Sequence, residues 1–335
     1  MTVSLVLVSL VSSLVMTAGL RRYALAKRVL DVPNARSSHT VPTPRGGGVA
    51  IVLVFLIGLA LLWKAGSVPT AVMLALAGAG SLVAFVGFLD DHSHIPARWR
   101  LLGHFVASAW ALFWLQGLPS VQLLHWRLEG SWLLAIIGCL YLVWLLNLYN
   151  FMDGIDGIAS VQAICVCGGN CLIYWASGHG ELIAEPALLA AAAAGFLYWN
   201  FPPARIFMGD AGSGFLGIAL GVLSVQAAWA SPALFWGWLI LLGVFIVDAT
   251  FTLARRLARG DKVYEAHRSH AYQFASRRYG KHLPVTIGVG IINVFWLLPI
   301  ALCVALLHLD GLIGLCIAYV PLVGLALRFK AGAIE

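Results

Sequence analysis

Residues 131–157 read SWLLAIIGCLYLVWLLNLYNFMDGIDG, a long apolar run followed at once by a polar, glycine-bearing segment. A helix needs about 20 mainly apolar residues to span the hydrocarbon core of a membrane. The apolar part of this stretch, 131–149, therefore predicts a membrane-spanning helix. The polar part is expected at the membrane surface where that helix ends.

The same apolar character runs through the whole chain. Of the 335 residues, 61% are hydrophobic and 10% are charged, whereas a soluble domain carries about 25% charged residues. This composition excludes a soluble globular protein and a disordered chain. The six cysteines lie inside apolar runs, so we expect them to be packing residues. We therefore expect an all-α polytopic membrane protein, one integral domain over residues 1–335 with about eleven membrane-spanning helices. The predicted spans are roughly 2–20, 47–63, 69–89, 101–116, 131–149, 157–176, 186–200, 212–228, 233–254, 284–308 and 311–327.

The distribution of basic residues predicts the orientation. All of the 21 Lys and Arg except Lys64 and Arg127 fall on one side of the predicted spans. Since basic loops stay in the cytoplasm, we expect a periplasmic N-terminus and a cytoplasmic C-terminus. The first span lacks a basic leader and is expected to be a retained anchor. The net charge of +7 then reflects topology and contact with anionic membrane lipids, and no nucleic-acid partner is predicted.

Acidic residues at the cytoplasmic ends of the spans are the anomaly. Asp90 and Asp91 are adjacent at the end of the third predicted span, where a helix terminus disfavours anions, so a compensating cation is expected. A solvated pair of loop acids is the plain alternative. Asn150, Asp153 and Asp156 follow the fifth span, and their oxygens suit a hard cation such as Mg²⁺ or the hydroxyls of a sugar. Helix capping by Asn and Asp-Gly turns would explain the same residues without a ligand.

A third acidic segment runs from Asn200 through Phe207 and Asp210 to Gly214. A glycine-rich turn that opens onto a helix offers backbone N–H groups to a phosphate. Asp210 within that turn is expected to hold a cation that bridges phosphate oxygens.

Two further cytoplasmic segments and one acid within a predicted span are also candidates for a functional role. The loop 255–281 is first of all a topology signal, but His267 and His270 beside Arg268 could donate hydrogen bonds to an anionic ligand. A zinc site lacks further ligands there. Asp248, within the ninth span, either lies near the inner interface or faces the protein interior. The proline- and glycine-rich loop 31–48 is either a rigid connector or a source of backbone N–H groups for a ligand.

Taken in order, these motifs resemble the polyprenyl-phosphate N-acetylhexosamine-1-phosphate transferases, which include the phospho-N-acetylmuramoyl-pentapeptide transferase of peptidoglycan synthesis. The finer resemblance is to the enzymes that begin bacterial O-antigen synthesis. It covers nearly the whole chain. The residues that carry it are Asp31-x-Pro33-Asn34-x-Arg36-x-x-His39-x-x-Pro42-x-Pro44-x-Gly46-Gly47, Asp90-Asp91, Asn147-x-x-Asn150-x-x-Asp153-Gly154-x-Asp156-Gly157 and Phe207-Met208-Gly209-Asp210-x-Gly212-Ser213.

The resemblance implies a Mg²⁺-dependent reaction, with Mn²⁺ as an alternative, between a UDP-N-acetylamino sugar and undecaprenyl phosphate, giving UMP and the diphosphate-linked sugar. It implies that Asp210 is a metal ligand and that Asp90 and Asp91 hold the metal or orient the lipid phosphate. A general-base role for Asp90 is a hypothesis. The implied substrate contacts are Phe207 on uracil with Asn200 nearby, Asn150, Asp153 and Asp156 around the nucleotide and diphosphate, and Arg36, Arg98 and Arg100 on phosphates.

One departure from the family pattern concerns the sugar. The usual His-x-His-His cluster is replaced here by the stretch Ser269–Gln273, with His267 upstream. This departure argues against the pentapeptide branch and leaves the amino sugar open. A homodimer and a covalent aspartyl intermediate also stay open. The alternative function is a transporter or flippase of lipid-linked sugars, which predicts ionisable residues near the bilayer midplane, where only Asp248 is a candidate.

Overall fold

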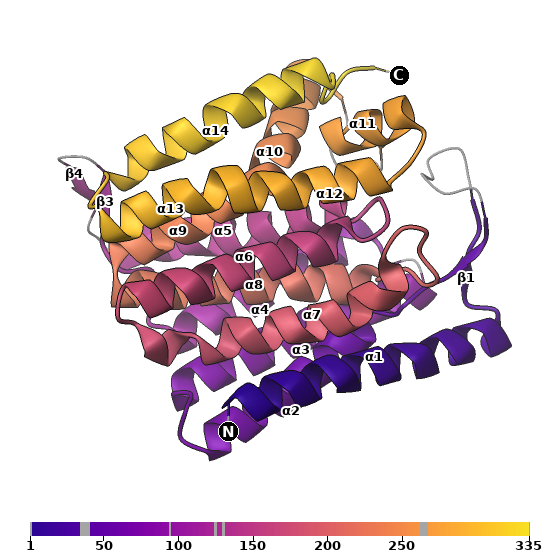
Figure 1. Ribbon diagram of the computed structural model, residues 1–335, viewed down its shortest axis with the longest axis horizontal. Helices are drawn as coiled ribbons and strands as arrows, with labels where there is room; N and C mark the ends of the chain where they lie inside the picture. Colours follow the sequence, from indigo (N-terminus) through magenta and orange to yellow (C-terminus); the bar gives the residue numbers. More distant parts are fainter. Residues whose placement is uncertain are drawn as a thin grey trace.

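The computed structural model describes residues 2–33, 41–93, 95–123, 126–128, 131–261 and 267–334. Most of these residues form helices that run side by side along one direction (Figure 1). The helices are α1 (Thr2–Lys27), α2 (Val49–Lys64), α3 (Thr70–His92), α4 (Ala97–Trp114), α5 (Ser131–Met152), α6 (Ile158–Ala176), α7 (Ala184–Asn200), α8 (Asp210–Ala230), α9 (Pro232–Leu241), α10 (Gly243–Ala258), α11 (Ala271–Tyr279), α12 (Leu283–Ile292), α13 (Leu298–Leu306) and α14 (Gly311–Arg328).

The remaining regular elements are short. A 3-10 turn, η1 (Gly180–Leu182), precedes α7, and a π-helical turn, η2 (Asn293–Leu297), joins α12 to α13. Two antiparallel strand pairs lie at opposite ends of the bundle (Figure 1). They are β1 (Leu30–Asp31) with β2 (Thr43–Pro44), and β3 (Val121–Leu123) with β4 (Trp126–Leu128).

The structure confirms an all-α polytopic membrane protein, and every predicted span coincides with helix. Within the described ranges, eight helical segments are long and apolar enough to cross a membrane, or nine if the bent pair α9 and α10 counts as one. Helix α2 has only 16 residues, and α4 begins with Arg98 and Arg100, which lower its hydropathy. The count of eleven spans and the orientation therefore stay predictions.

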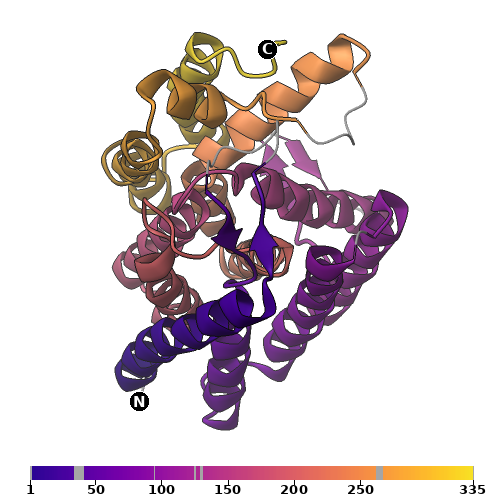
Figure 2. The same ribbon diagram turned by 90° about the vertical axis from the view of Figure 1, so that its right-hand side faces the viewer.

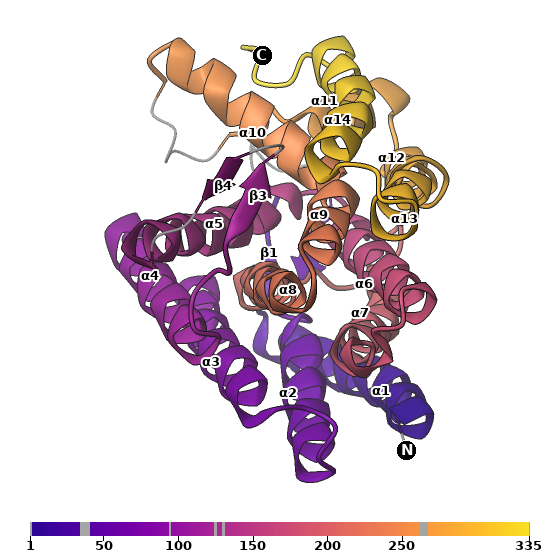
Figure 3. The ribbon, with the colours of Figure 1, turned by 90° about the vertical axis from the view of Figure 1, so that its left-hand side faces the viewer.

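Helix α8 lies at the centre of the bundle, surrounded by other helices (Figure 3). Its small residues explain this position. A Cβ atom on Gly217 would lie 2.7 Å from Cα of Leu146, and one on Gly221 would lie 2.7 Å from a methyl group of Leu142. Because glycine has no side chain, α5 can approach the α8 backbone closely. The start of α8, at Asp210, is thereby fixed relative to its neighbours.

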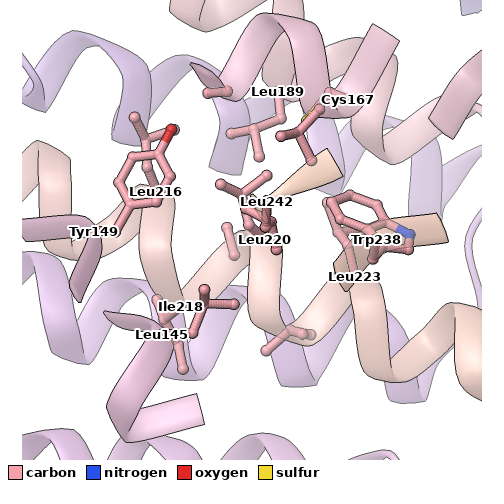
Figure 4. Close-up of a cluster of buried hydrophobic side chains, with 14 of the residues drawn as sticks. Leu145, Tyr149, Cys167, Leu189, Leu216, Ile218, Leu220, Leu223, Trp238 and Leu242 are labelled. Atoms are coloured by element: carbon pink, nitrogen blue, oxygen red, sulfur yellow. The ribbon is translucent and has the colours of Figure 1, made fainter. Parts of the chain in front are cut away.

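Large apolar side chains fill the space around α8 (Figure 4). Tyr149 from α5 is fully buried and donates its hydroxyl to the carbonyl of Ala159 at 2.6 Å. Trp238 from α9 donates its ring N–H to the hydroxyl of Tyr174 at 2.6 Å. All six cysteines are free thiols. Cys167 is buried in this core, as predicted for a packing residue, whereas Cys316 is exposed on the bundle surface and does not follow that prediction.

The ends of the helices that carry the predicted site lie at one end of the bundle. Figure 2 views this end, with the strand pair β1–β2 in front of α8. Helices α3, α5 and α7 finish here, and α4, α6, α8 and α12 begin here (Figure 1). The loops between them bring together segments that are far apart in the sequence.

Candidate active site

The proline- and glycine-rich loop after β2 docks directly on the segment that leads into α8. The amide of Phe207 donates to the carbonyl of Pro44 at 2.8 Å, and the amide of Gly47 donates to the carbonyl of Phe207 at 2.9 Å. Gly48 continues the pattern with the carbonyl of Met208 at 2.9 Å. Two of the glycine N–H groups are therefore used within the protein, which supports the rigid-connector interpretation of this loop. The docking places Arg45 at the start of α8.

Asp91 anchors the amino end of α8 from a different helix. Its carboxylate accepts the amide of Asp210 at 3.0 Å and the amide of Ala211 at 3.3 Å. A helix amino end has unpaired N–H groups and a partial positive charge, so it stabilises a carboxylate placed there. Gly209 has φ of 78°, and a Cβ atom there would lie 2.6 Å from an Asp91 oxygen. Only glycine fits this approach without strain.

Two arginines neutralise the acids around this helix end. Arg45 lies 2.6 Å from an oxygen of Asp91 and 3.2 Å from an oxygen of Asp210. Arg100 forms an ion pair with Asp90 and lies 3.7 Å from the other oxygen of Asp210. The cation expected beside Asp90 and Asp91 is thus supplied, in this structure, by two guanidinium groups. Three carboxylates share two arginines, so the cluster retains an excess of negative charge if all three are ionised.

Asp153 adds a fourth carboxyl group to this region, directly after α5. Burial raises the pKa of Asp153 well above its usual value, and the nearby Asp210 raises it further, while Arg45 opposes the shift. A buried carboxyl group near other carboxylates favours its protonated form. A cation bound among these groups would reverse that preference.

The donor set fits a magnesium ion that arrives with a phosphate-bearing ligand. In the part of the chain that the structure describes, no three His, Cys, Asp or Glu side chains converge as a complete metal site. Mg²⁺ is usually held in proteins by only one or two carboxylates, with water and substrate phosphates as the other ligands. Asp90 and Asp210, which face the same guanidinium group of Arg100, provide those two carboxylates. Asp91 is less available because both of its oxygens accept backbone amides.

A cavity of about 160 Å³ opens beside this cluster, between α3, α4, α5 and α8. Its polar wall includes Asp90, Arg100 and Asp210, and its apolar wall includes Val86 and Leu101. Asn150 also lines it and donates its side-chain amide to the hydroxyl of Ser213 at 2.9 Å. The cavity therefore combines a charged end with apolar walls.

A second, larger cavity of about 460 Å³ lies around Phe207 and Asp156. One oxygen of Asp156 accepts the amide of Ala204 at 3.0 Å, and the other lies 3.1 Å from Nδ1 of His282. Asp156 thus ties the loop before α8 to the start of α12. Lys281 adds a basic side chain to the same wall.

Some predicted residues have other tasks. Asn200 is 3% exposed, accepts the amide of Gly157 at 2.9 Å and donates to the carbonyl of Ile206 at 3.0 Å, so it positions the wall of the larger cavity. His270 is buried and lies 3.3 Å from Asp248, which corrects the expectation that both histidines face a ligand. Asp248 itself faces the protein interior.

Three other basic candidates have neighbours outside the carboxylate cluster. His267 is half-buried and lies 3.0 Å from the Ser269 hydroxyl. Arg268 accepts a hydrogen bond from Arg277 at its backbone carbonyl. Arg98 is exposed, and its guanidinium group is 5.8 Å from the centre of the Trp99 ring. Arg36 lies outside the described residues.

Sequence reasoning did not select several residues that the structure brings to the site. Arg45 was part of a motif, but nothing in the sequence paired it with Asp91 and Asp210. His282 had no signal because it stands in a loop whose basic residues are explained by topology. His104 lines the smaller cavity, and its Nδ1 is buried without a hydrogen-bond partner within the described residues.

Comparison with known proteins places this site in a family. Residues 73–228 match the model of glycosyl transferase family 4. A probable undecaprenyl-phosphate N-acetylglucosaminyl 1-phosphate transferase of Bacillus subtilis is 29% identical over 272 residues, which cover 79% of this chain and 75% of the relative. A decaprenyl-phosphate N-acetylglucosaminephosphotransferase of Mycolicibacterium smegmatis is 29% identical over 82% of this chain and 76% of its own length. The chain is similar, over most of its length, to members of the polyprenyl-phosphate hexosamine-1-phosphate transferase family.

These similarities confirm the resemblance inferred from the motifs. A phospho-N-acetylmuramoyl-pentapeptide-transferase of Moorella thermoacetica is also similar, 33% identical over 55% of this chain and 61% of its own length. The similarities support a membrane-bound sugar-phosphate transferase. The family match covers all five predicted site aspartates, whereas Arg45 and His282 lie outside it.

Proposed function

We propose that the protein transfers an N-acetylamino-sugar 1-phosphate from a UDP-sugar to undecaprenyl phosphate, releasing UMP. The reaction would commit the sugar to a membrane-linked pathway such as O-antigen or another envelope polysaccharide. The observation that carries this proposal is the placement of Asp90, Arg100 and Asp210 at one wall of a cavity that also has an apolar wall. A phosphate on a hydrocarbon chain needs a site of this mixed character.

The acceptor requires positioning more than activation. A phosphomonoester has its second pKa near about 6, so the lipid phosphate is already largely a dianion at neutral pH. One of its oxygens attacks the sugar-bearing phosphorus of the donor. The bond from that phosphorus to the bridging oxygen breaks, and the electron pair leaves with UMP. No proton has to be removed from the acceptor, so the ion pair of Asp90 with Arg100 need not be broken for a base.

Arg45 and Arg100 have two tasks in this scheme. They hold the carboxylates of Asp91, Asp90 and Asp210 in place, and they lower the repulsion that an incoming phosphate would meet. We assign the metal to Asp210 and Asp90, with Asp91 as the residue that fixes the start of α8. A magnesium ion bound there would neutralise charge on the phosphate oxygens.

The larger cavity is the proposed nucleotide site. Phe207 offers an aromatic face at its wall, and Asp156 lies opposite a loop containing Lys281 and His282. An aromatic side chain suits a base by stacking. Direct contact of Asn200 with the nucleotide stays a prediction, since both ends of its amide already have partners.

We further propose that the active site faces the cytoplasm of a bacterial inner membrane, where UDP-sugars are made. The predicted topology supports this, because the site lies at the end of the bundle that carries most basic residues. The alternative of a lipid-linked sugar transporter is weakened. A transporter would need ionisable residues near the bilayer midplane, and the candidate for that role, Asp248, instead accepts hydrogen bonds from the first two backbone amides of α11.

The test uses detergent-purified protein with undecaprenyl phosphate, Mg²⁺ and a panel of UDP-N-acetylhexosamines. We expect UMP release that requires the lipid, the metal and Asp210, with the Asp210→Asn variant at least about 100-fold slower. The matched control is Asp310→Asn, which changes an acid at the opposite end of the bundle, at the start of α14. Release of UMP without lipid, or an Asp210→Asn rate equal to wild type, would overturn the proposal.

A further inference from the structure

The buried acid Asp248 holds the start of helix α11. Its two oxygens accept the amide of Ala271 at 2.9 Å and the amide of Tyr272 at 3.0 Å. Thr252 and His270 also lie within 3.3 Å of one of these oxygens. Asp248 is only 6% exposed, and the positive end of the α11 dipole compensates its charge. The acid from α10 therefore fixes the position of α11.

Helix α11 then contacts the end of α5 and the loop that carries Asp153 and Asp156. The Tyr272 hydroxyl donates to the carbonyl of Phe151 at 3.0 Å. Phe151 is in the last turn of α5, where carbonyl groups have no partner within the helix. Asp153 follows two residues later. The hydroxyl thus stabilises the point at which α5 gives way to the aspartate loop.

Tyr272 approaches the backbone of residue 154 so closely that only glycine fits there. A Cβ atom on Gly154 would lie 2.1 Å from the Tyr272 hydroxyl oxygen and 3.1 Å from its ring. Tyr272 is 5% exposed, so it has little room to move away. The Asp153–Gly154 backbone therefore rests directly on the tyrosine.

We propose that Tyr272 is a positioning residue for the transfer reaction, which holds the Asp153–Gly154 turn against the carboxylate cluster through its hydroxyl. The inference rests on the proposed function. The Tyr272 hydroxyl donates to a backbone carbonyl and is not proposed to contact a substrate. It fixes the backbone on which Asp153 is placed near Asp210, and Asp248 fixes the tyrosine.

The position of Asp153 matters because its carboxyl group lies close enough to other acidic side chains to interact with them electrostatically. Asp210, Asp91 and Asp156 all act to raise the pKa of Asp153. A small displacement of the Asp153–Gly154 turn would change these electrostatic interactions and the position of the Asp153 carboxyl group relative to a bound phosphate. We therefore expect the loss of the Tyr272 hydroxyl to lower the rate of the bound complex and leave substrate affinity nearly unchanged.

The first test is Tyr272→Phe in the UMP-release assay, with Tyr279→Phe as the matched control, because Tyr279 is an exposed tyrosine on the same helix. We expect kcat to fall about tenfold in Tyr272→Phe, as for the loss of one buried hydrogen bond. The KM for each substrate should stay within about twofold, since the hydroxyl contacts neither substrate. A kcat equal to that of Tyr279→Phe would overturn the inference.

The second test uses suppression. Gly154→Ala should lose activity by more than about 100-fold because its methyl group meets the tyrosine hydroxyl. Adding Tyr272→Phe removes the atom it meets, so the double variant should be faster than Gly154→Ala alone. A double variant as slow as, or slower than, Gly154→Ala would contradict the positioning role. Thermal unfolding in detergent checks that each variant is folded.

A third measurement connects Asp248 to the same path. Each oxygen of Asp248 accepts one backbone amide, from Ala271 or Tyr272, and Asp248→Asn leaves only one acceptor oxygen for the two amides. We therefore expect Asp248→Asn to lower kcat, as Tyr272→Phe does. If Asp248 and Tyr272 both act on the Asp153–Gly154 turn, kcat of the double variant should fall by less than the product of the two single fold-changes. Independent, multiplicative losses would refute the path. A wild-type protein that releases no UMP with any lipid and sugar would overturn the proposed function and this inference together.

Discussion

At the scale of single residues, Arg45 is the side chain on which the carboxylate cluster depends most. It lies within ion-pair distance of both Asp91 and Asp210, and so joins the end of α3 to the start of α8. A guanidinium group can serve two carboxylates at once, whereas a lysine ammonium acts as a point charge on a flexible stem.

We predict that Arg45→Lys retains part of the transferase activity and that Arg45→Ala loses at least about 100-fold. Among the described residues, Arg45 is the cation within 3.2 Å of both acids, and its removal leaves Asp91 with two backbone amides and no cationic partner. UMP release and thermal unfolding of both variants measure this. Equal rates for wild type and Arg45→Ala would show that the two carboxylates do not need this bridge.

His267 gives a residue-scale prediction about pH. Burial, with His270 and Arg256 nearby, lowers the pKa of His267 to about 3. The unfolded chain binds a proton at a histidine pKa near about 6.5. Between these values the unfolded state binds more protons, so this histidine lowers stability as the pH falls below about 6.5.

We therefore expect the thermal midpoint of wild type to fall more than that of His267→Gln when the pH is lowered from about 7.5 to about 5.5. The other titratable groups are the same in both proteins, so the difference reports His267. Parallel curves for the two proteins would show that His267 is protonated in the folded state.

At the scale of elements, the contact between α3 and α8 determines how the acids meet. A Cβ atom on Gly87 would lie 2.5 Å from the carbonyl carbon and oxygen of Asp210. Because Gly87 stands one helical turn before Asp90 and Asp91, this approach sets the distance between the two acidic segments. Overpacking at such a contact typically costs about 1–3 kcal/mol.

We predict that Gly87→Ala lowers transferase activity at least about tenfold and also lowers the thermal midpoint, since the added methyl group separates α3 from α8. Gly168→Ala in α6 is the control, because a Cβ atom there meets nothing within 4 Å. If Gly87→Ala behaved like Gly168→Ala, the two helices would not need this close approach.

The helices were predictable from the sequence because apolar runs of membrane length leave few alternatives. The bend of 67° between α9 and α10 was not. The run 233–254 is apolar on both sides of the bend, so hydropathy does not register a change of direction. The two halves separate at Gly243, where a Cβ atom would lie 2.8 Å from the Tyr319 ring.

The candidate site was predictable only in part, for a physical reason. Asp90, Asp91 and Asp210 stand out because acids are unusual at the ends of apolar spans. Their partners depend on the docking of the loop 44–48 on 207–208, and no local pattern reveals this long-range contact. His270 was misjudged because its partner, Asp248, is 22 residues away on another helix.

At the scale of the whole molecule, the helix ends and loops that supply the carboxylate cluster and line the two cavities lie at one end of the bundle. Figure 1 shows these helix ends together. The basic segments lie at the same end, which the predicted topology places in the cytoplasm. A water-soluble nucleotide sugar should therefore reach the site from one side of the membrane only.

We predict that inverted membrane vesicles containing the protein release UMP from added UDP-sugar without permeabilisation. Right-side-out vesicles should do so only after permeabilisation, because the donor cannot cross the bilayer. Detergent-opened vesicles of both kinds provide the control for equal enzyme content. Activity in sealed right-side-out vesicles would contradict the proposed orientation.

The central claim is that a sugar phosphate, and not the sugar alone, moves to the lipid. The most direct measurement follows a UDP-N-acetylhexosamine labelled with ³²P at the sugar-bearing phosphorus, incubated with undecaprenyl phosphate, Mg²⁺ and the purified protein. We predict that the label appears in the lipid fraction as a diphosphate-linked sugar and that the released UMP is unlabelled. Label released in UDP, with an unlabelled lipid-linked sugar, would contradict it.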